Sequence, residues 1–86
     1  MLERSLTVAP NPTTGQTAVL LNLEQPTQLS WTLYDLTGRR VQQQPLHWLS
    51  AGENELRLDL SGLPAGLYTL SLEADGRLFS RKVALN

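Results

Sequence analysis

The feature that most constrains this chain is a two-residue alternation of apolar and polar side chains, which recurs in short segments along its length. Leu56, Leu58 and Leu60 alternate with charged residues and form the clearest such segment. Successive side chains of a strand point to opposite faces, so this alternation predicts strands with one buried and one solvated face. The segments recur about every 8 to 12 residues, a spacing typical of a sandwich or barrel.

Turn-forming residues separate these segments. Pro10-Asn11-Pro12 ends the first one, because proline cannot donate to a sheet ladder and holds the preceding residue in an extended conformation. Gly15 follows in the turn that leads into the second segment. Asp35-Leu36-Thr37-Gly38 predicts a short hairpin connection, with Asp at the first position and Gly at the last. Asp75-Gly76 predicts a type I′ hairpin turn, which requires positive φ at both central positions.

The segments predict an all-β chain of seven strands, at about residues 6–8, 17–23, 29–34, 39–49, 55–60, 67–73 and 77–85. Seven short antiparallel strands fit an immunoglobulin-like β-sandwich, and a small barrel is the alternative. The second segment is apolar on both faces, which predicts an interior position. The fourth changes phase at Pro45, which predicts a bulge or an edge strand. Arg81 interrupts the last segment and predicts an edge, with its stem packed and its head in water.

Length and charge narrow the function classes. The chain has 86 residues, enough for a single domain with a thin core, and contains no cysteine for disulfides or thiolate metal sites. Its formal net charge is -1 and its seven basic residues are scattered, so the basic patch of a nucleic-acid-binding protein is missing. We expect no membrane span, because no apolar run approaches the roughly 18 residues required, and the first residues lack the apolar core of a signal peptide.

We find no constellation of catalytic side chains and expect neither enzymatic activity nor a cofactor or metal. His47 is the only histidine, and without a second histidine or a cysteine it predicts a structural or solvated side chain. Glu53, Glu55 and Asp59 lie in one segment with Arg57 between the last two, which is typical of a solvated row of charges. Serine and aspartate occur without a nucleophile elbow or a comparable frame.

The aromatic residues keep a second function class open. Trp31 and Tyr68 lie on apolar strand faces and predict core positions. Tyr34 and Trp48 are predicted at the surface, where aromatic rings can stack on sugars. A carbohydrate-binding or adhesive accessory module of a surface enzyme is therefore one alternative, and a passive fibronectin-like spacer is another.

Four stretches, taken in order, resemble the type A C-terminal sorting domain of the type IX (Por) secretion system. They are VAPNPTTG at 8–15, LYDLTGRRV at 33–41, AGENELRLDLSGLPAGLYTLSLE at 51–73 and RKVALN at 81–86, and together they span nearly the whole chain. The family often has a pair of lysines near its end, where this chain has Arg81-Lys82. The positions that match the motifs of the family are Pro10, Asn11, Pro12, Gly15, Asp35, Gly38, Arg39, Gly66, Tyr68, Lys82 and Val83.

The resemblance implies a secretion signal that is itself a folded domain, here residues 1–86 of a larger secreted protein. The cargo would precede this domain, cross the inner membrane by an N-terminal signal peptide, and pass through the periplasm. The implied partners are the outer-membrane translocon and shuttle components of the secretion system. A sortase-like protease at the cell surface would remove the domain, leaving the cargo at the cell surface or in the medium, and can join it to an anionic lipopolysaccharide.

Recognition of such a signal has a simple physical route. A translocon that accepts many cargoes needs a surface that does not depend on the cargo, and a strand edge can be bound by β-augmentation. The last strand is therefore the expected recognised element. Motif residues such as Pro64 and Gly66 are expected to act mainly through backbone geometry, by fixing the turn that sends Tyr68 into the core. An end at Asn86 would favour a sorting signal over a spacer.

Overall fold

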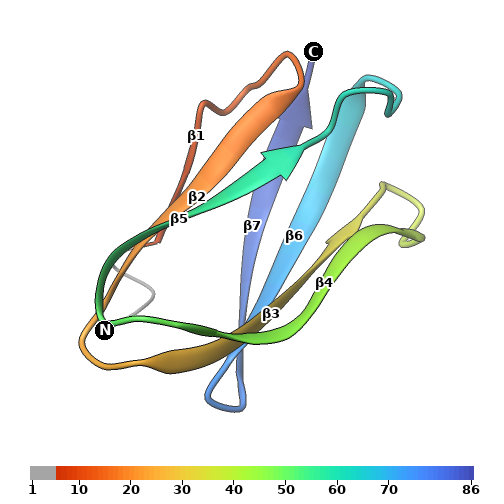
Figure 1. Cartoon of the computed structure of the whole chain (residues 1–86). Coiled ribbons are helices and arrows are strands. Elements are labelled where there is room, and N and C mark those ends of the chain that lie inside the picture. Colours follow the sequence, from red (N-terminus) through yellow and green to blue (C-terminus); the bar gives the residue numbers. More distant parts are fainter. Residues whose placement is uncertain (1–5) are drawn as a thin grey trace.

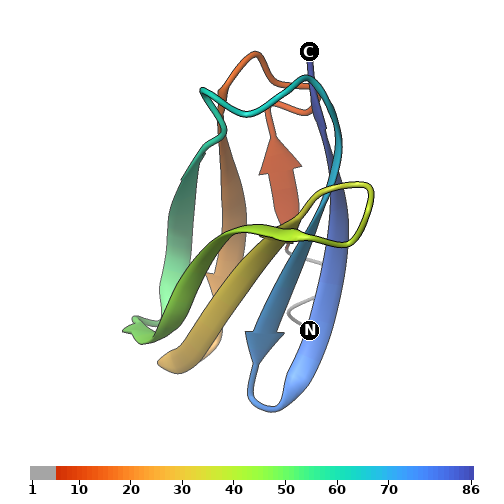
Figure 2. The same ribbon diagram turned by 90° about the vertical axis from the view of Figure 1, so that its right-hand side faces the viewer.

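The computed structural model describes residues 6–86, and its strands form two antiparallel sheets packed face to face (Figures 1 and 2). One sheet has the order β1-β2-β5 and the other has the order β4-β3-β6-β7. This arrangement confirms the predicted seven-stranded sandwich over the small barrel. The strands are β1 (Thr7–Ala9), β2 (Gln16–Leu23), β3 (Thr27–Tyr34), β4 (Arg40–Leu49), β5 (Gly52–Asp59), β6 (Gly66–Ala74) and β7 (Arg77–Leu85).

The core lies between the sheets and is built from the alternating apolar positions. β2 occupies the centre of its sheet, as its apolar character on both faces predicted. Burying each large aliphatic side chain stabilises the fold by about 1.5–3 kcal/mol relative to leaving it exposed. The buried apolar residues are Leu6, Val19, Leu21, Leu23, Leu29, Leu33, Leu56, Leu58, Leu60, Tyr68, Leu70, Leu72, Ala74, Phe79, Val83 and Leu85.

The irregular fourth segment is both an edge strand and a bulged one. Leu29 pairs with His47 and Trp31 pairs with Gln44, so the register between β3 and β4 shifts across Pro45 and the residue after it. The shift confirms the predicted bulge. Trp31 packs against the core but is only half-buried. Its partner on the edge strand is the exposed Gln44, which supplies no apolar cover. The prediction that Trp31 lies in the core is therefore only partly correct.

The connection between β6 and β7 has the predicted turn. Asp75 and Gly76 have φ values of 52° and 73°, the left-handed conformation that a type I′ turn requires at both positions. The two strands then pair without interruption from Ala74 and Arg77 to Gly66 and Leu85. Within residues 6–86 the chain forms no helix long and apolar enough to cross a membrane.

Candidate functional site

The residues that match the sorting-domain motifs gather at one end of the sandwich, which we call the motif end. It comprises residues 10–15, 35–39, 60–66 and 82–86, and lies where the β1–β2, β3–β4 and β5–β6 connections meet the end of β7 (Figures 1 and 2). Antiparallel strands reverse direction at every connection, so alternate connections fall at the same end. Tyr68 lies just inside β6, close to this end. Motifs that are far apart in the sequence therefore contribute to one surface.

Asn11 fastens the β1–β2 loop to the last strand. Its Nδ2 donates to the carbonyl oxygen of Lys82 at 2.8 Å, and its Oδ1 accepts from the backbone N–H of Ala84 at 3.0 Å. One side-chain amide thus supplies the donor and the acceptor that a neighbouring strand would present. The peptide bonds before Pro10 and Pro12, on either side of this residue, are both cis.

Thr13 continues this contact through its backbone. Its N–H donates to the carbonyl of Ala84 at 2.8 Å, and its carbonyl accepts from the N–H of Asn86 at 2.9 Å. Its hydroxyl accepts from the N–H of Gly15 and donates to the carbonyl of Gln16, which holds the loop in shape. The residue is 2% exposed. Asn11 and Thr13 together cover the outer edge of β7 from Lys82 to its end.

The same loop is also joined to the three-stranded sheet. The carbonyl of Gly15 accepts from the N–H of Leu60 at 2.7 Å, and the Thr17 hydroxyl donates to the carbonyl of Pro10 at 2.7 Å. Because β5 and β7 belong to different sheets, these bonds connect the two layers at the motif end. The loop that begins with PNP therefore connects the two sheets, in addition to ending β1.

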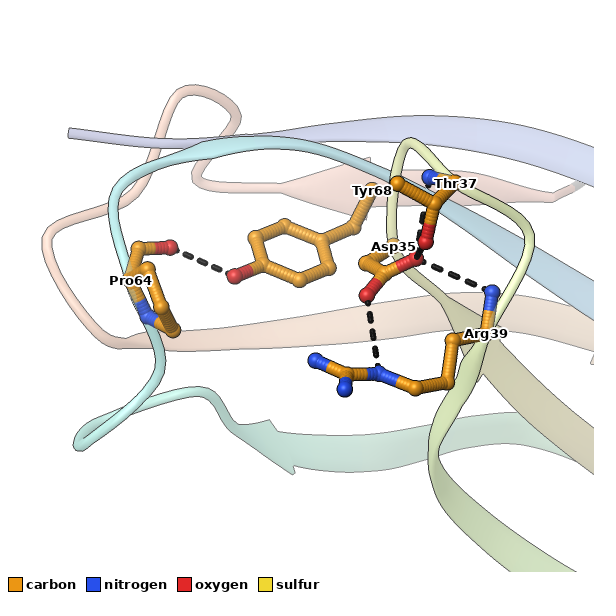
Figure 3. A network of polar contacts seen from close by, with 5 residues as sticks. All are labelled: Asp35, Thr37, Arg39, Pro64 and Tyr68. Atoms are coloured by element: carbon orange, nitrogen blue, oxygen red, sulfur yellow. Dashed lines mark hydrogen bonds and ion pairs between the residues drawn. The ribbon is translucent and has the colours of Figure 1, made fainter.

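Asp35 organises the turn between β3 and β4 (Figure 3). Its Oδ1 accepts from the Thr37 hydroxyl at 2.7 Å, the Arg39 N–H at 2.9 Å and the Thr37 N–H at 3.0 Å. The Gly38 N–H donates to the Asp35 carbonyl, and Gly38 has a φ of 85°, which a side chain would strain. The Thr37 hydroxyl, followed by the Arg39 N–H, holds the pKa of Asp35 below its ordinary value. The predicted hairpin with Asp first and Gly last is confirmed.

Arg39 presents most of its charge to solvent. Its Nε lies 3.3 Å from Oδ2 of Asp35, while its side chain remains largely exposed. Surface ion pairs of this kind contribute little to stability. The guanidinium lies beside the Asp35 carboxylate at the motif end, with its two Nη groups directed away from the carboxylate (Figure 3).

Tyr68 locks the LPAG turn that precedes its own strand. Its hydroxyl donates to the carbonyl of Pro64, four residues upstream, and the side chain is 4% exposed (Figure 3). A tyrosine bonded to the backbone a few residues earlier is the device called a tyrosine corner in immunoglobulin-like sandwiches. Gly66 begins β6 with a φ of 154° and has open space where a Cβ would lie. The expected backbone role of Pro64 and Gly66 agrees with these contacts.

The two basic residues near the chain end, Arg81 and Lys82, lie in different environments. Lys82 lies on the outer face, where its Nζ donates to the Thr69 hydroxyl at 3.1 Å, and Val83 is fully buried. Arg81 shares the face of Val83 and is half-buried on an edge strand, as its position in the pattern predicted. Lys82 is thus available at the surface, whereas Val83 serves the core.

The acidic residues of β5 and His47, which the sequence offered as other candidate groups, make separate local contacts. The Glu55 carboxylate lies 2.8 Å from Nε of the exposed Arg57. The Ser61 hydroxyl, followed by the Ser61 N–H, donates to Asp59 and lowers the pKa of that carboxyl group. Nδ1 of His47 lies 3.0 Å from the carbonyl oxygen of Pro45. Residues 6–86 contain no group of three or more His, Cys, Asp or Glu side chains that could hold a metal. These contacts are those of solvated or structural side chains.

Tyr34 and Trp48 do not form one aromatic platform. Trp48 is 66% exposed and Tyr34 is half-buried, and they pair with Gln28 and Arg40 at different ends of the β3–β4 hairpin. Six residues of the regular strand β3 separate the two rows, which corresponds to about 20 Å along a strand. A single sugar unit cannot stack on both rings.

The two hydrogen bonds from Asn11 to β7, which we call the Asn11 clamp, were not predicted from the sequence. The roles of Thr13 and Thr17 were not predicted either. These side chains bond to backbone groups that are distant in the chain or to turn carbonyls, and such bonds leave no periodic signal. The order of the strands alone implies that successive connections lie at opposite ends of the sandwich. It would have indicated that the PNP, DLTG and LPAG stretches meet at one end.

Asn11, Thr13, Asp35 and Tyr68 bond to backbone atoms of the same domain and so hold the loops of the motif end in shape. A scan against protein families matches the family described as secretion system C-terminal sorting domain over residues 7–86. A search of curated proteins gives no match. The matched range contains every residue of the motif end.

Proposed function

Because the chain belongs to the family of type IX secretion C-terminal sorting domains, we propose that it carries an attached cargo protein through the outer-membrane translocon. A domain of this family is a sorting signal for export to the cell surface or the extracellular space, and it implies an interaction with the secretion machinery. The finer proposal is that the cargo passes through the periplasm first and that the translocon and its shuttle components bind the folded domain.

The observation that supports this proposal is the construction of the motif end. Asn11 ties the β1–β2 loop to β7 there, while Asp35 and Tyr68 each fix the shape of their own turn through bonds to backbone. Such bonds make the shape of this end independent of whatever protein precedes it. A receptor that serves many cargoes needs a constant surface of this kind, and charge-bearing side chains such as Arg39 and Lys82 are displayed on it.

We further propose that a sortase-like protease at the cell surface removes the domain after transit. The domain would then have no role in the finished cargo and no need for a site of its own chemistry. The absence of a catalytic constellation in the sequence is consistent with an assignment as a non-enzymatic signal.

The test fuses residues 1–86 to the end of a periplasmic reporter in a host that has this secretion system. We expect the reporter at the cell surface or in the medium, and the same reporter without the domain in the periplasm. Periplasmic retention of a fusion whose domain resists proteolysis would refute the proposal. Removing residues 82–86 is a poor negative control, because it deletes the buried Val83 and the partners of Asn11 and Thr13. Point variants at exposed positions are better.

A further inference from the structure

The free edge of β7 is divided into a covered and an open half. The N–H and C=O of Ala84 face away from β6, since they bond to the β1–β2 loop. Outward groups recur at every second residue of a strand, so those of Leu78 and Ser80 also face away from β6. The loop covers the edge from Lys82 onward, and within residues 6–86 no strand pairs with the part at residues 77–81. We call this part the open edge. The Ser80 carbonyl accepts from Nη1 of its neighbour Arg81 at 2.8 Å, an exposed bond that a binding strand would replace.

The other sheet edges of the described chain carry features that discourage pairing. β1 has three residues and is followed by proline, and β4 is bulged around Pro45. β5 alternates charged side chains on its outer face, and the carbonyl of Asp59 already accepts from Nε2 of Gln42 on the opposite sheet. Prolines, bulges, charges and short length are the usual protection of sheet edges. The open edge has no proline and no register shift, and its charges are all of one sign, so they discourage a basic strand and not an acidic one.

The side chains around the open edge define what could bind there. Leu78 is 70% exposed and lies on the outer face with Ser80. Arg77 lies over the Phe79 ring at 6.0 Å from its centre, and Arg81 and Lys82 follow. Three cations within six residues disfavour a basic or second identical strand and favour an acidic one. An apolar side chain of the binding segment would cover Leu78.

We propose that the open edge is the docking site for an extended acidic segment of the secretion machinery, which adds a strand beside β7. The segment pairs with the outward backbone groups of Leu78 and Ser80, and its carboxylates lie near Arg77 and Arg81, which share one face of β7. The Asn11 clamp ends this pairing at Lys82 and so fixes its extent. This inference rests on the proposed function, and it shifts the recognised part of the last strand from its terminal residues to its first half.

Proline at position 80 tests the backbone pairing. Ser80→Pro removes an N–H that faces away from β6, so the β6–β7 ladder through Phe79 and Arg81 remains, and proline is tolerated at such edge positions. Ser80→Ala is the matched control, since it changes the side chain and keeps the N–H. We expect the Ser80→Pro fusion to be exported about tenfold less than the Ser80→Ala fusion, as expected for loss of about one well-formed hydrogen bond.

A binding assay with defined probes tests the charge preference. The 15N-labelled chain is titrated with acetyl-Val-Glu-Val-Glu-Val-amide and, separately, with the lysine analogue acetyl-Val-Lys-Val-Lys-Val-amide. We expect the acidic peptide alone to shift the amide signals of Leu78 and Ser80, with the signal of Ala84 unchanged. Arg77→Glu, which keeps every backbone group, should weaken this binding several-fold even if Ser80→Pro does not fold.

The outcomes separate this inference from the function it rests on. A wild-type fusion that stays in the periplasm refutes the proposed function. A wild-type fusion that is exported, together with a folded Ser80→Pro variant exported equally well, overturns the docking site and leaves the sorting function intact. Equal binding of the acidic and basic peptides, or an unchanged affinity in Arg77→Glu, likewise overturns it.

Discussion

Replacing Asn11 by alanine should loosen the end of β7 without disturbing the core. The substitution removes two hydrogen bonds, of 2.8 Å to the Lys82 carbonyl and 3.0 Å from the Ala84 N–H. A typical net contribution is about 0.5–1.5 kcal/mol for each bond. Because both bonds are exposed and water replaces the lost partners, we expect a loss near the lower end, about 1–2 kcal/mol of unfolding free energy in total. For a domain of this size that corresponds to a fall in Tm of roughly 5–15 °C.

Two measurements check this expectation. Thermal unfolding by circular dichroism gives Tm for the wild type, Asn11→Ala and the control Gln44→Ala, which truncates an exposed side chain on a different edge strand. Hydrogen exchange then follows the amide of Ala84, whose protection should fall by a factor of about 5–30, the equilibrium change that 1–2 kcal/mol represents. The amide of Val83, which faces β6, should change less.

A particular result would refute the reasoning. If Asn11→Ala and Gln44→Ala melt at the same temperature and the Ala84 amide keeps its protection, the side-chain amide does not hold the edge. The contacts of Thr13 would then be sufficient to cover β7, and the clamp could not set the limit of the open edge.

Three further predictions concern the motif end and its turns. Tyr68→Phe should cost about 1 kcal/mol, because the Pro64 carbonyl loses its partner, and denaturant titration should show an earlier midpoint with an unchanged slope. Gly38→Ala should cost about 1–2 kcal/mol, because an alanine is strained at a φ of 85°, and thermal unfolding will show it. The stabilising effect of Asp35 is complete above its ordinary pKa of 3.8 and is lost as pH falls through its lower folded-state value, so wild type and Asp35→Asn should differ in Tm at pH 7 and converge as the pH falls below that value.

Much of this fold follows from local patterns in the sequence. Alternating leucines on β5 predicted a half-buried strand, Asp75-Gly76 predicted its turn, and the change of phase at Pro45 predicted the bulge. Each depends on residues that are close in the chain, where side-chain direction and backbone preference suffice. Trp31 was expected in the core and is half-buried, because its cover depends on which strand lies beside it.

The contacts that shape the candidate site depend on distant neighbours. Asn11 and its two partners on β7 are more than 70 residues apart, and nothing in the PNP stretch indicates a hydrogen bond to the last strand. Periodicity assigns a residue to a face of its own strand and does not say which strand or loop lies next to it. For the same reason the last strand could be expected as an exposed edge, while the division of that edge into covered and open halves could not.

The direction of β1 has a consequence for the geometry of the whole secreted molecule. β1 runs from Thr7 toward the motif end, so the described part of the chain reaches that end only after it has paired with β2. Under the proposed function, a cargo would join the chain ahead of β1 and not at the motif end. A cargo of any size could then be attached without altering the contacts that form the motif end.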